Sequence, residues 1–126
     1  MAKHIKTGQK GEALAEKKLQ GLGYRILERN WRFKHLEVDL IAVESDVLVF
    51  VEIKTRNDLR YGSPDEAVDC KKERKLARAA EIYMDKTRYD GEVRFDIVSV
   101  LWPQDMPTHF DAPPTVEVIK DAFWPK

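Results

Sequence analysis

The stretch of sequence that decides the fold is residues 37–54, which read EVDLIAVESDVLVFVEIK. Two runs rich in β-branched and apolar residues, 37–43 and 47–54, flank the short polar segment 44–46, a pattern typical of a β-hairpin. Apolar residues occupy both alternating sets of positions in each run. We therefore expect a hairpin in the middle of a sheet that is covered on both sides.

The hairpin has the same register whether its loop contains two or four residues. This register places Asp39 opposite Glu52, and Glu37 opposite Lys54, with their side chains on one face. Directly opposed residues in an antiparallel pair have Cβ atoms roughly 4.5–5.5 Å apart. The remaining pairs on that face are Ile41 with Phe50 and Val43 with Leu48, and those on the other face are Val38 with Ile53, Leu40 with Val51 and Ala42 with Val49.

Two carboxylates opposed on a buried face repel each other, and an unpaired buried carboxylate costs several kcal/mol or takes up a proton. A divalent cation between Asp39 and Glu52 would remove this conflict. Oxygen ligands without histidine or thiolate favour Mg²⁺ or Mn²⁺. Lys54 falls on the same face, where it can orient or help deprotonate the attacking water, or stabilise charge on a phosphate.

The spacing acid-x-Lys is weak evidence by itself, because it occurs four times in the chain. Three of the four lie on predicted helices, where a charged face is the ordinary explanation. Only Glu52 and Lys54 end an apolar strand with an acid opposite. The competing interpretation is a frayed, solvated hairpin end at which Lys54 bridges Glu37 or Glu52.

The rest of the chain predicts one α/β domain over residues 1–126, with a mixed central sheet flanked by helices on both faces. Ser63, Pro64 and Glu66 are typical of the start of a helix. The expected elements are a helix over 8–22, an edge strand over 24–30, a basic irregular segment over 29–35, a helix over about 63–84, a strand over 92–101, a loop over 103–114 and a strand over 116–119.

Composition predicts a cytoplasmic protein without a membrane partner. The longest apolar run, residues 47–51, is too short to span a bilayer, and no secretory hydrophobic region is expected at the N-terminus. Cys70 is the only cysteine, which excludes an internal disulfide. The net charge is zero, but residues 1–88 carry 19 of the 22 Lys and Arg and 15 of the 22 Asp and Glu. This split is compatible with one basic face.

Several motifs follow one another from residue 8 to about residue 100. They are GQKGE at 8–12, Ala15, Leu19, GY at 23–24, NWR at 30–32, EVDLI at 37–41, VFVEIKTR at 49–56, EAV at 66–68, Lys72 and RFD at 94–96. In this order and spacing they closely resemble the YraN-like family of predicted bacterial endonucleases. Leu36 departs from the pattern, since many relatives have a glycine at this position.

The YraN-like family resembles archaeal Holliday-junction resolvases within the PD-(D/E)xK nuclease superfamily, which implies a restriction-endonuclease-like core. Carried over by position, Asp39 and Glu52 bind metal, Lys54 is catalytic, and Glu12 is an additional acid of the resolvase-like branch. All four groups are present, which favours an active hydrolase. Related resolvases work as symmetric dimers, so the resemblance also makes a homodimer an expectation.

Four basic residues are candidates for holding the phosphate backbone: Arg29, Arg32, Arg56 and Lys72. A generic basic surface explains the three arginines equally well. Lys72 precedes Leu76 and Ala80 by whole helical turns, so it shares their inward-facing stripe and could reach a phosphate from the second helix; a side chain that snorkels to solvent explains it equally well. Asp96, in an apolar strand, is expected to be a hydrogen-bonded structural acid. The C-terminal stretch could be a subunit contact or a lid on the core.

Two functions from different classes stand at this point. The first is a metal-dependent DNA endonuclease or exonuclease, acting by analogy on branched or recombining DNA, with RNA left open as a substrate. The second is a non-catalytic nucleic-acid-binding or assembly domain that keeps the nuclease fold.

Overall fold

The computed structural model describes residues 2–56, 70–101 and 114–123. In these ranges it contains five strands, which form one sheet in the order β1-β2-β3-β4-β5, and two helices. The elements are α1 (Ala2–Gly21), β1 (Arg25–Phe33), β2 (Leu36–Glu44), β3 (Val47–Arg56), α2 (Cys70–Thr87), β4 (Val93–Leu101) and β5 (Thr115–Ile119). Among the strands of the described ranges, only β3 and β4 pair in parallel, so the sheet is mixed. The expected α/β class is confirmed, and the arrangement is compatible with a restriction-endonuclease-like core.

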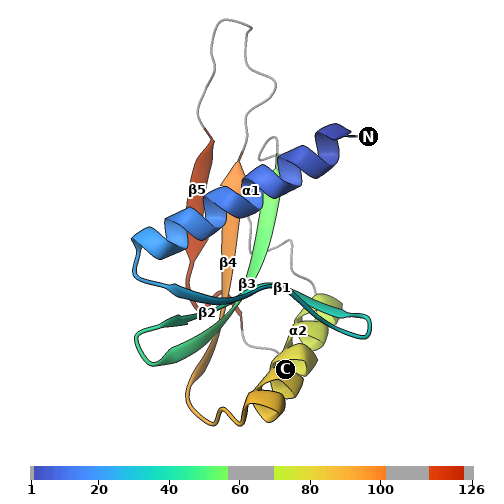
Figure 1. The fold of residues 1–126 in the computed structure, drawn as a ribbon, viewed down its shortest axis with the longest axis vertical. Coiled ribbons are helices and arrows are strands. Elements are labelled where there is room, and N and C mark those ends of the chain that lie inside the picture. Colours follow the sequence, from blue (N-terminus) through green and yellow to red (C-terminus); the bar gives the residue numbers. More distant parts are fainter. Residues whose placement is uncertain (1, 57–69, 102–113, 124–126) are drawn as a thin grey trace, which may run out of the picture.

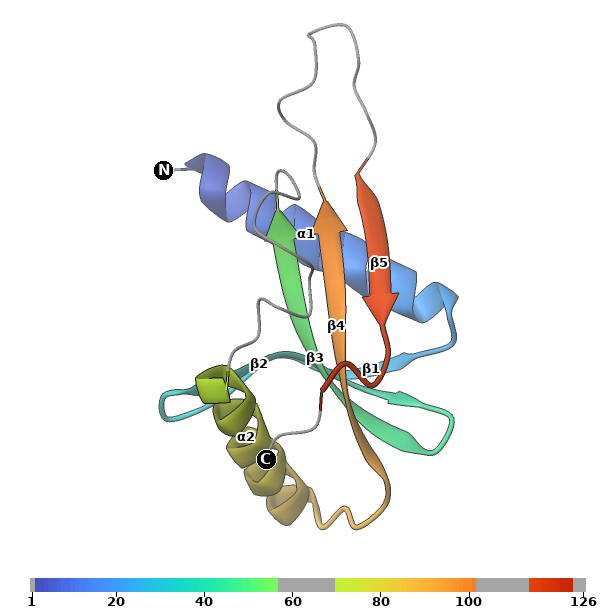
Figure 2. The same cartoon turned by 180° about the vertical axis from the view of Figure 1, so that it is seen from behind.

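The two helices cover opposite faces of the sheet (Figures 1 and 2). Each face has its own core. The α1 side buries Ala15, Leu19, Tyr24, Leu40, Ala42, Val49, Val51, Val98 and Val100. The α2 side buries Leu36, Val38, Ile41, Leu48, Phe50, Leu76, Ala79, Ala80, Tyr83, Phe95 and Ile97. The prediction of a central hairpin with two covered faces is confirmed.

The register predicted for the hairpin is confirmed over its inner part. The pairs run from Glu44 with Val47 at the turn to Leu40 with Val51. Ser45 lies in the turn with a φ of 55°, in the left-handed region that tight turns use.

The prediction for the outer part of the hairpin is wrong, because β2 leaves β3 beyond Leu40. Leu40 belongs to the core on the α1 side, whereas Val38 belongs to the core on the α2 side together with Ile41. Regular alternation would place Val38 and Leu40 on one face, so the strand changes sides at Asp39. The neighbouring strand β1 is also irregular in this region, since Asn30 has a φ of 51°.

The first part of β2 pairs with β1 alone, whereas its inner part pairs with both β1 and β3. Phe33 lies opposite Leu36 and Arg32 opposite Glu37, and the ladder with β3 stops at Leu40, so Glu37 does not face Lys54 as expected. The expected irregular segment at 29–35 is therefore also wrong, since the strand continues to Phe33. In Figure 1 the β1–β2 ribbon crosses the direction of β3, β4 and β5.

The other expected elements agree with the structure except at their ends. The first helix begins earlier, at Ala2, and the second ends later, at Thr87. The predicted helix start at Ser63 and Pro64 and most of the 103–114 loop lie outside the described residues. Within the described ranges, no helix is long and apolar enough to span a bilayer.

Candidate metal and catalytic site

Asp39 lies at the fork where β2 separates from β3. Its Oδ2 accepts a hydrogen bond from the backbone N–H of Ile53 at 2.7 Å. A continued ladder would have paired Ile53 with Val38. The carboxylate of Asp39 therefore takes over the role of a strand carbonyl and ties the end of β2 to β3.

Glu52 and Lys54 project from β3 toward the α2 side of the sheet. The alternation along β3 fixes this direction, since Phe50 belongs to the α2-side core and Val51 to the α1-side core. Glu52 is buried, with 5% of its surface exposed, whereas Lys54 is half-buried. Ser99 of β4, a residue that sequence reasoning missed, pairs with Lys54 in the parallel ladder and is buried.

The electrostatics of Asp39 show that the fork gathers negative charge. The pKa of Asp39 is raised to about 7, chiefly by burial, then by the charge of Glu52 and to a smaller extent by that of Glu12. The hydrogen bond from Ile53 and the charge of Lys72 lower the same pKa. Asp39 therefore lies within electrostatic reach of the two other predicted acids.

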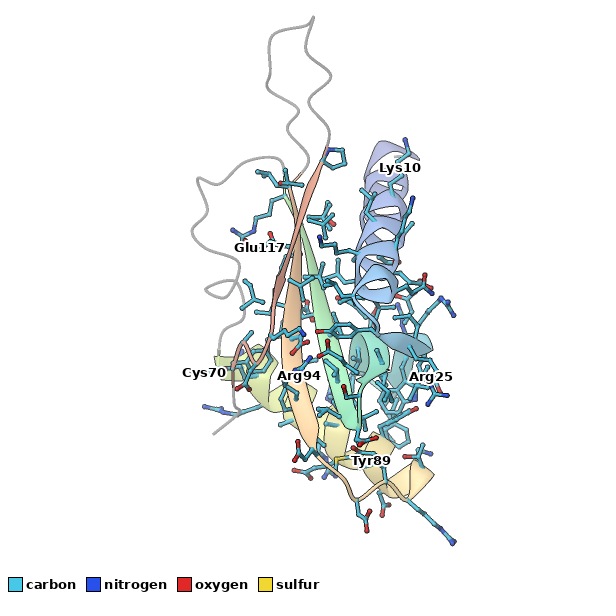
Figure 3. All side chains as sticks on the ribbon, turned by 90° about the vertical axis from the view of Figure 1, so that its left-hand side faces the viewer. Lys10, Arg25, Cys70, Tyr89, Arg94 and Glu117 are labelled. Atoms are coloured by element: carbon cyan, nitrogen blue, oxygen red, sulfur yellow. The ribbon has the colours of Figure 1, made fainter. Side chains whose placement is uncertain are left out.

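Glu12 reaches this region from α1, on the other side of the sheet from α2. The helix can approach β3 closely because residue 11 is glycine: a Cβ at Gly11 would overlap the hydroxyl oxygen of Thr55. Figure 3 shows the sheet nearly edge-on, with Lys10 of α1 on one side and Cys70, the first residue of α2, on the other. No cluster of three or more His, Cys, Asp and Glu side chains suited to a metal is found in the described residues. Asp39 and Glu52 are the two carboxylates of the fork that could hold a cation, with water completing its shell.

Lys72 of α2 brings a second positive charge to the site, next to that of Lys54. Its Nζ lies 2.5 Å from Oε1 of Glu52, and its side chain is 40% exposed whereas that of Glu52 is 6% exposed. The prediction that Lys72 shares the inward stripe of Leu76 and Ala80 is confirmed, because both of these residues are buried. Sequence reasoning assigned Lys72 to a phosphate and missed its contact with Glu52.

The competing interpretation of Lys54, a bridge to Glu37 or Glu52, is not what the structure shows. Glu52 pairs with Lys72, and Glu37 pairs with Arg32 at 3.5 Å. Among the residues that the structure describes, no ion pair of Lys54 is found. Lys54 is thus held beside Glu52 by the strand itself and not by a salt bridge.

The three arginines predicted to hold a phosphate backbone are not gathered in one place. Arg29 donates to Glu16 of α1 from Nε at 2.9 and 3.0 Å, and Arg32 lies beside Glu37 on β2. Both arginine side chains are more than half exposed. The pair of Arg32 with the exposed Glu37 is of the weak surface kind, whereas Glu16 holds Arg29 through two of its nitrogens. Arg56 is the last residue of β3.

Asp96 has the structural role that its sequence context indicates. It is fully buried and accepts hydrogen bonds from the hydroxyl of Tyr24 at 2.6 Å, from Arg94 at 2.8 Å and from the backbone N–H of Asp121 at 3.0 Å. Arg94 also donates to Glu44 at 2.7 Å. This network ties the C-terminal segment to the sheet, and its donors leave Asp96 satisfied without a metal.

Comparison with known proteins gives one consistent result. The model of a family described as "Uncharacterised protein family UPF0102" matches residues 11–100, a range that includes Glu12, Asp39, Glu52, Lys54 and Lys72. A UPF0102 protein of Chlorobium chlorochromatii (strain CaD3) is 45% identical over 117 residues, which are 93% of this chain and 90% of that protein. A UPF0102 protein of Rhodococcus jostii (strain RHA1) is 44% identical over 127 residues, which cover 98% of this chain and all of that protein. The resemblance to YraN-like proteins is thereby confirmed, and the chain belongs to the UPF0102 family.

Proposed function

We propose that this protein is a divalent-metal-dependent nuclease that hydrolyses phosphodiester bonds in DNA. The observation that carries the proposal is the position of Asp39 at the fork of β2 and β3, beside the buried Glu52. Burial and the charge of Glu52 raise the pKa of Asp39 to about 7. Two acids in this situation gain from a shared cation, because a cation favours the charged form of both.

The donor set suits Mg²⁺ or Mn²⁺, since it consists of carboxylate oxygens and leaves room for water and phosphate oxygens. The ligands would be Asp39 and Glu52. When bound, such a cation supplies Lewis-acid stabilisation of the negative charge that builds up on the phosphate during hydrolysis. The hydrogen bond from the N–H of Ile53 to Oδ2 would hold the carboxylate of Asp39 in place for such a cation.

Lys54 and Glu12 would act from opposite sides of the sheet. Lys54 follows Glu52 on the same face of β3, where its ammonium group would orient the attacking water or stabilise charge on the phosphate. Glu12 adds negative charge near Asp39 and would help to hold a cation or a water molecule there. Such a positioned general acid or base contributes about 10²- to 10⁴-fold to the rate.

DNA is the substrate that the family resemblance supports, with branched or recombining DNA as the first structures to test. The exposed guanidinium groups of Arg29 and Arg32 would bind phosphate through long-range charge and not through specific bases. RNA carries the same backbone phosphates and should be tested in the same assay.

A second function is favoured by one observation, the ion pair between Lys72 and Glu52. This pair already neutralises the most buried acid of the site with a group of the protein itself. A non-catalytic nucleic-acid-binding domain would therefore need no metal to neutralise Glu52.

Measurement of Mn²⁺ binding and of cleavage on the same variants separates the two functions. Wild type is expected to bind Mn²⁺ in calorimetric titration and to cleave at least one of single-stranded, duplex, flap or four-way DNA or RNA. Glu52→Gln should lose both properties, whereas Lys54→Met should keep Mn²⁺ binding and lose turnover by about 10²- to 10⁴-fold. Lys75→Met, at an exposed position of α2, is the matched control and should behave as wild type.

Equal cleavage by wild type and Glu52→Gln in Mn²⁺ would sink the nuclease proposal, because the signal would then come from a contaminant. Binding of DNA without Mn²⁺ binding would support the non-catalytic domain instead.

A further inference from the structure

Lys72 lies between solvent and the most buried acid of the fork. Its Nζ is 2.5 Å from Oε1 of Glu52, yet 40% of its side chain is exposed and that of Glu52 is 6% exposed. The flexible four-carbon stem of a lysine allows its ammonium group to leave such a contact toward water.

The charge of Lys72 is also felt by the second acid. It lowers the pKa of Asp39, against the larger effects of burial and of Glu52. One ammonium group thus acts on both carboxylates that the proposed function assigns to a metal.

A divalent cation held by Asp39 and Glu52 would repel the ammonium group of Lys72 if both stayed on Glu52. Like charges a few ångströms apart at a half-buried site interact strongly, because little water screens them. An incoming divalent cation therefore has to displace Lys72 from Glu52.

We propose that Lys72 is the resident counter-ion of this acid pair: it holds the place of the metal, is displaced when the metal binds, and then contacts a phosphate of the substrate. This inference rests on the proposed function. It assigns Lys72 two successive partners, Glu52 without metal and phosphate with metal.

The test is a titration of the full-length protein with Mn²⁺ alone. Binding is measured by calorimetry or from the electron paramagnetic resonance signal of free Mn²⁺. Lys72→Met removes the competing cation and is expected to bind Mn²⁺ about tenfold more tightly than wild type. Lys72→Arg keeps a cation and should stay within about threefold of wild type. Lys75→Met removes an exposed positive charge from the same helix and should leave the affinity unchanged.

Two further measurements on Lys72→Met extend the test. Without metal its midpoint of thermal unfolding should fall below that of wild type, because Glu52 is left without a partner, and saturating Mn²⁺ should remove the difference. In Ca²⁺, its affinity for a DNA duplex should fall relative to that of Lys75→Met.

Unchanged or weaker Mn²⁺ binding by Lys72→Met would overturn the inference, while metal-dependent cleavage by wild type would leave the nuclease proposal intact. If Lys72→Met does not fold, the comparison rests on Lys72→Arg: a change in Mn²⁺ affinity of about tenfold or more, with the charge retained, would overturn the inference. Absence of Mn²⁺ binding by wild type would overturn both.

Discussion

Gly11 of α1 and Thr55 of β3 approach each other so closely that a methyl group on residue 11 would overlap the threonine hydroxyl. This contact lies directly beside Glu12 on the helix and directly after Lys54 on the strand. The missing side chain of Gly11 therefore sets how near the first helix, and with it Glu12, comes to the fork.

Gly11→Ala is expected to destabilise the protein although alanine is the better helix former. The gain in helix propensity is about 1 kcal/mol, whereas overpacking costs about 1–3 kcal/mol. Urea unfolding of the variant measures the balance. Gly21→Ala is the matched control, because a Cβ there meets no atom within 4 Å, and it should be neutral or stabilising.

The double variant Gly11→Ala/Thr55→Ala tests the cause. Removal of the threonine hydroxyl and methyl should restore most of the stability that Gly11→Ala loses, measured as a favourable coupling in the double-mutant cycle. Additive losses would mean that the helix is held at this distance by other contacts.

Asp39→Asn is expected to change how stability depends on pH. The pKa of Asp39 is raised to about 7 in the folded protein, against an ordinary value of 3.8. The folded state thus holds this proton more tightly, and the contribution of Asp39 to stability is lost as the pH rises from about 4 to about 7. Each pH unit in this window lowers the free energy of unfolding by at most about 1.4 kcal/mol, so the total loss from Asp39 is at most about 4 kcal/mol.

The measurement is the free energy of unfolding from about pH 4 to about pH 8 in EDTA. The amide that replaces the carboxylate in Asp39→Asn keeps an oxygen for the N–H of Ile53 and carries no charge. The advantage of this variant over wild type should therefore grow up to about pH 7 and then level off. Asp46→Asn, in the exposed turn, should run parallel to wild type. Parallel curves for Asp39→Asn as well would show that Asp39 titrates normally.

The part of the fold that the sequence predicts is the part that short-range patterns control. The pairs from Glu44 with Val47 to Leu40 with Val51 follow from the short loop, because loops of two and of four residues give the same register. The burial of both faces follows from the apolar residues at nearly every position of the two runs.

The fork could not be predicted because no local pattern marks it. Apolar residues lie on both sides of Asp39 in the sequence, so the run shows no break there. The left-handed conformation of Asn30 is available to many asparagines that do not adopt it. The change of face occurs where β2 keeps its pairing with β1 but no longer pairs with β3, and this pairing is a property of the assembled sheet.

The contacts of the candidate site also differ in whether a local pattern predicts them. Residues that share a strand, such as Glu52 and Lys54, could be placed from alternation alone. The pairing of Lys72 with Glu52 depends on how α2 packs on the sheet, and the approach of Gly11 to Thr55 depends on where α1 crosses it. Both are long-range arrangements.

Arg94→Met is expected to cost about 3–5 kcal/mol, because it leaves the fully buried carboxylate of Asp96 without its charged partner. Arg94→Met/Asp96→Asn should recover a large part of this loss, since the buried charge is then also removed. Chemical denaturation of the single and double variants gives the coupling. Arg78→Met breaks an exposed pair with Glu81 at 3.4 Å and should change stability by less than about 1 kcal/mol. A loss of that small size for Arg94→Met would mean that Tyr24 and the backbone satisfy Asp96 without the guanidinium.

Phe123→Ala distinguishes a lid on the core from a subunit contact. The ring of Phe123 stacks on that of Phe95 with centroids 5.2 Å apart, and the N–H of Ala122 donates to the carbonyl of Phe95 at 2.8 Å, so the C-terminal segment covers the α2-side core of its own chain. Loss of this ring should lower the free energy of unfolding by about 2–4 kcal/mol, toward the lower end because Phe123 is half-buried. Because the contact lies within one chain, the loss should be the same across roughly a hundredfold range of protein concentration. A loss that grows on dilution would instead identify the segment as part of a dimer interface, since only the stability of an oligomer depends on concentration.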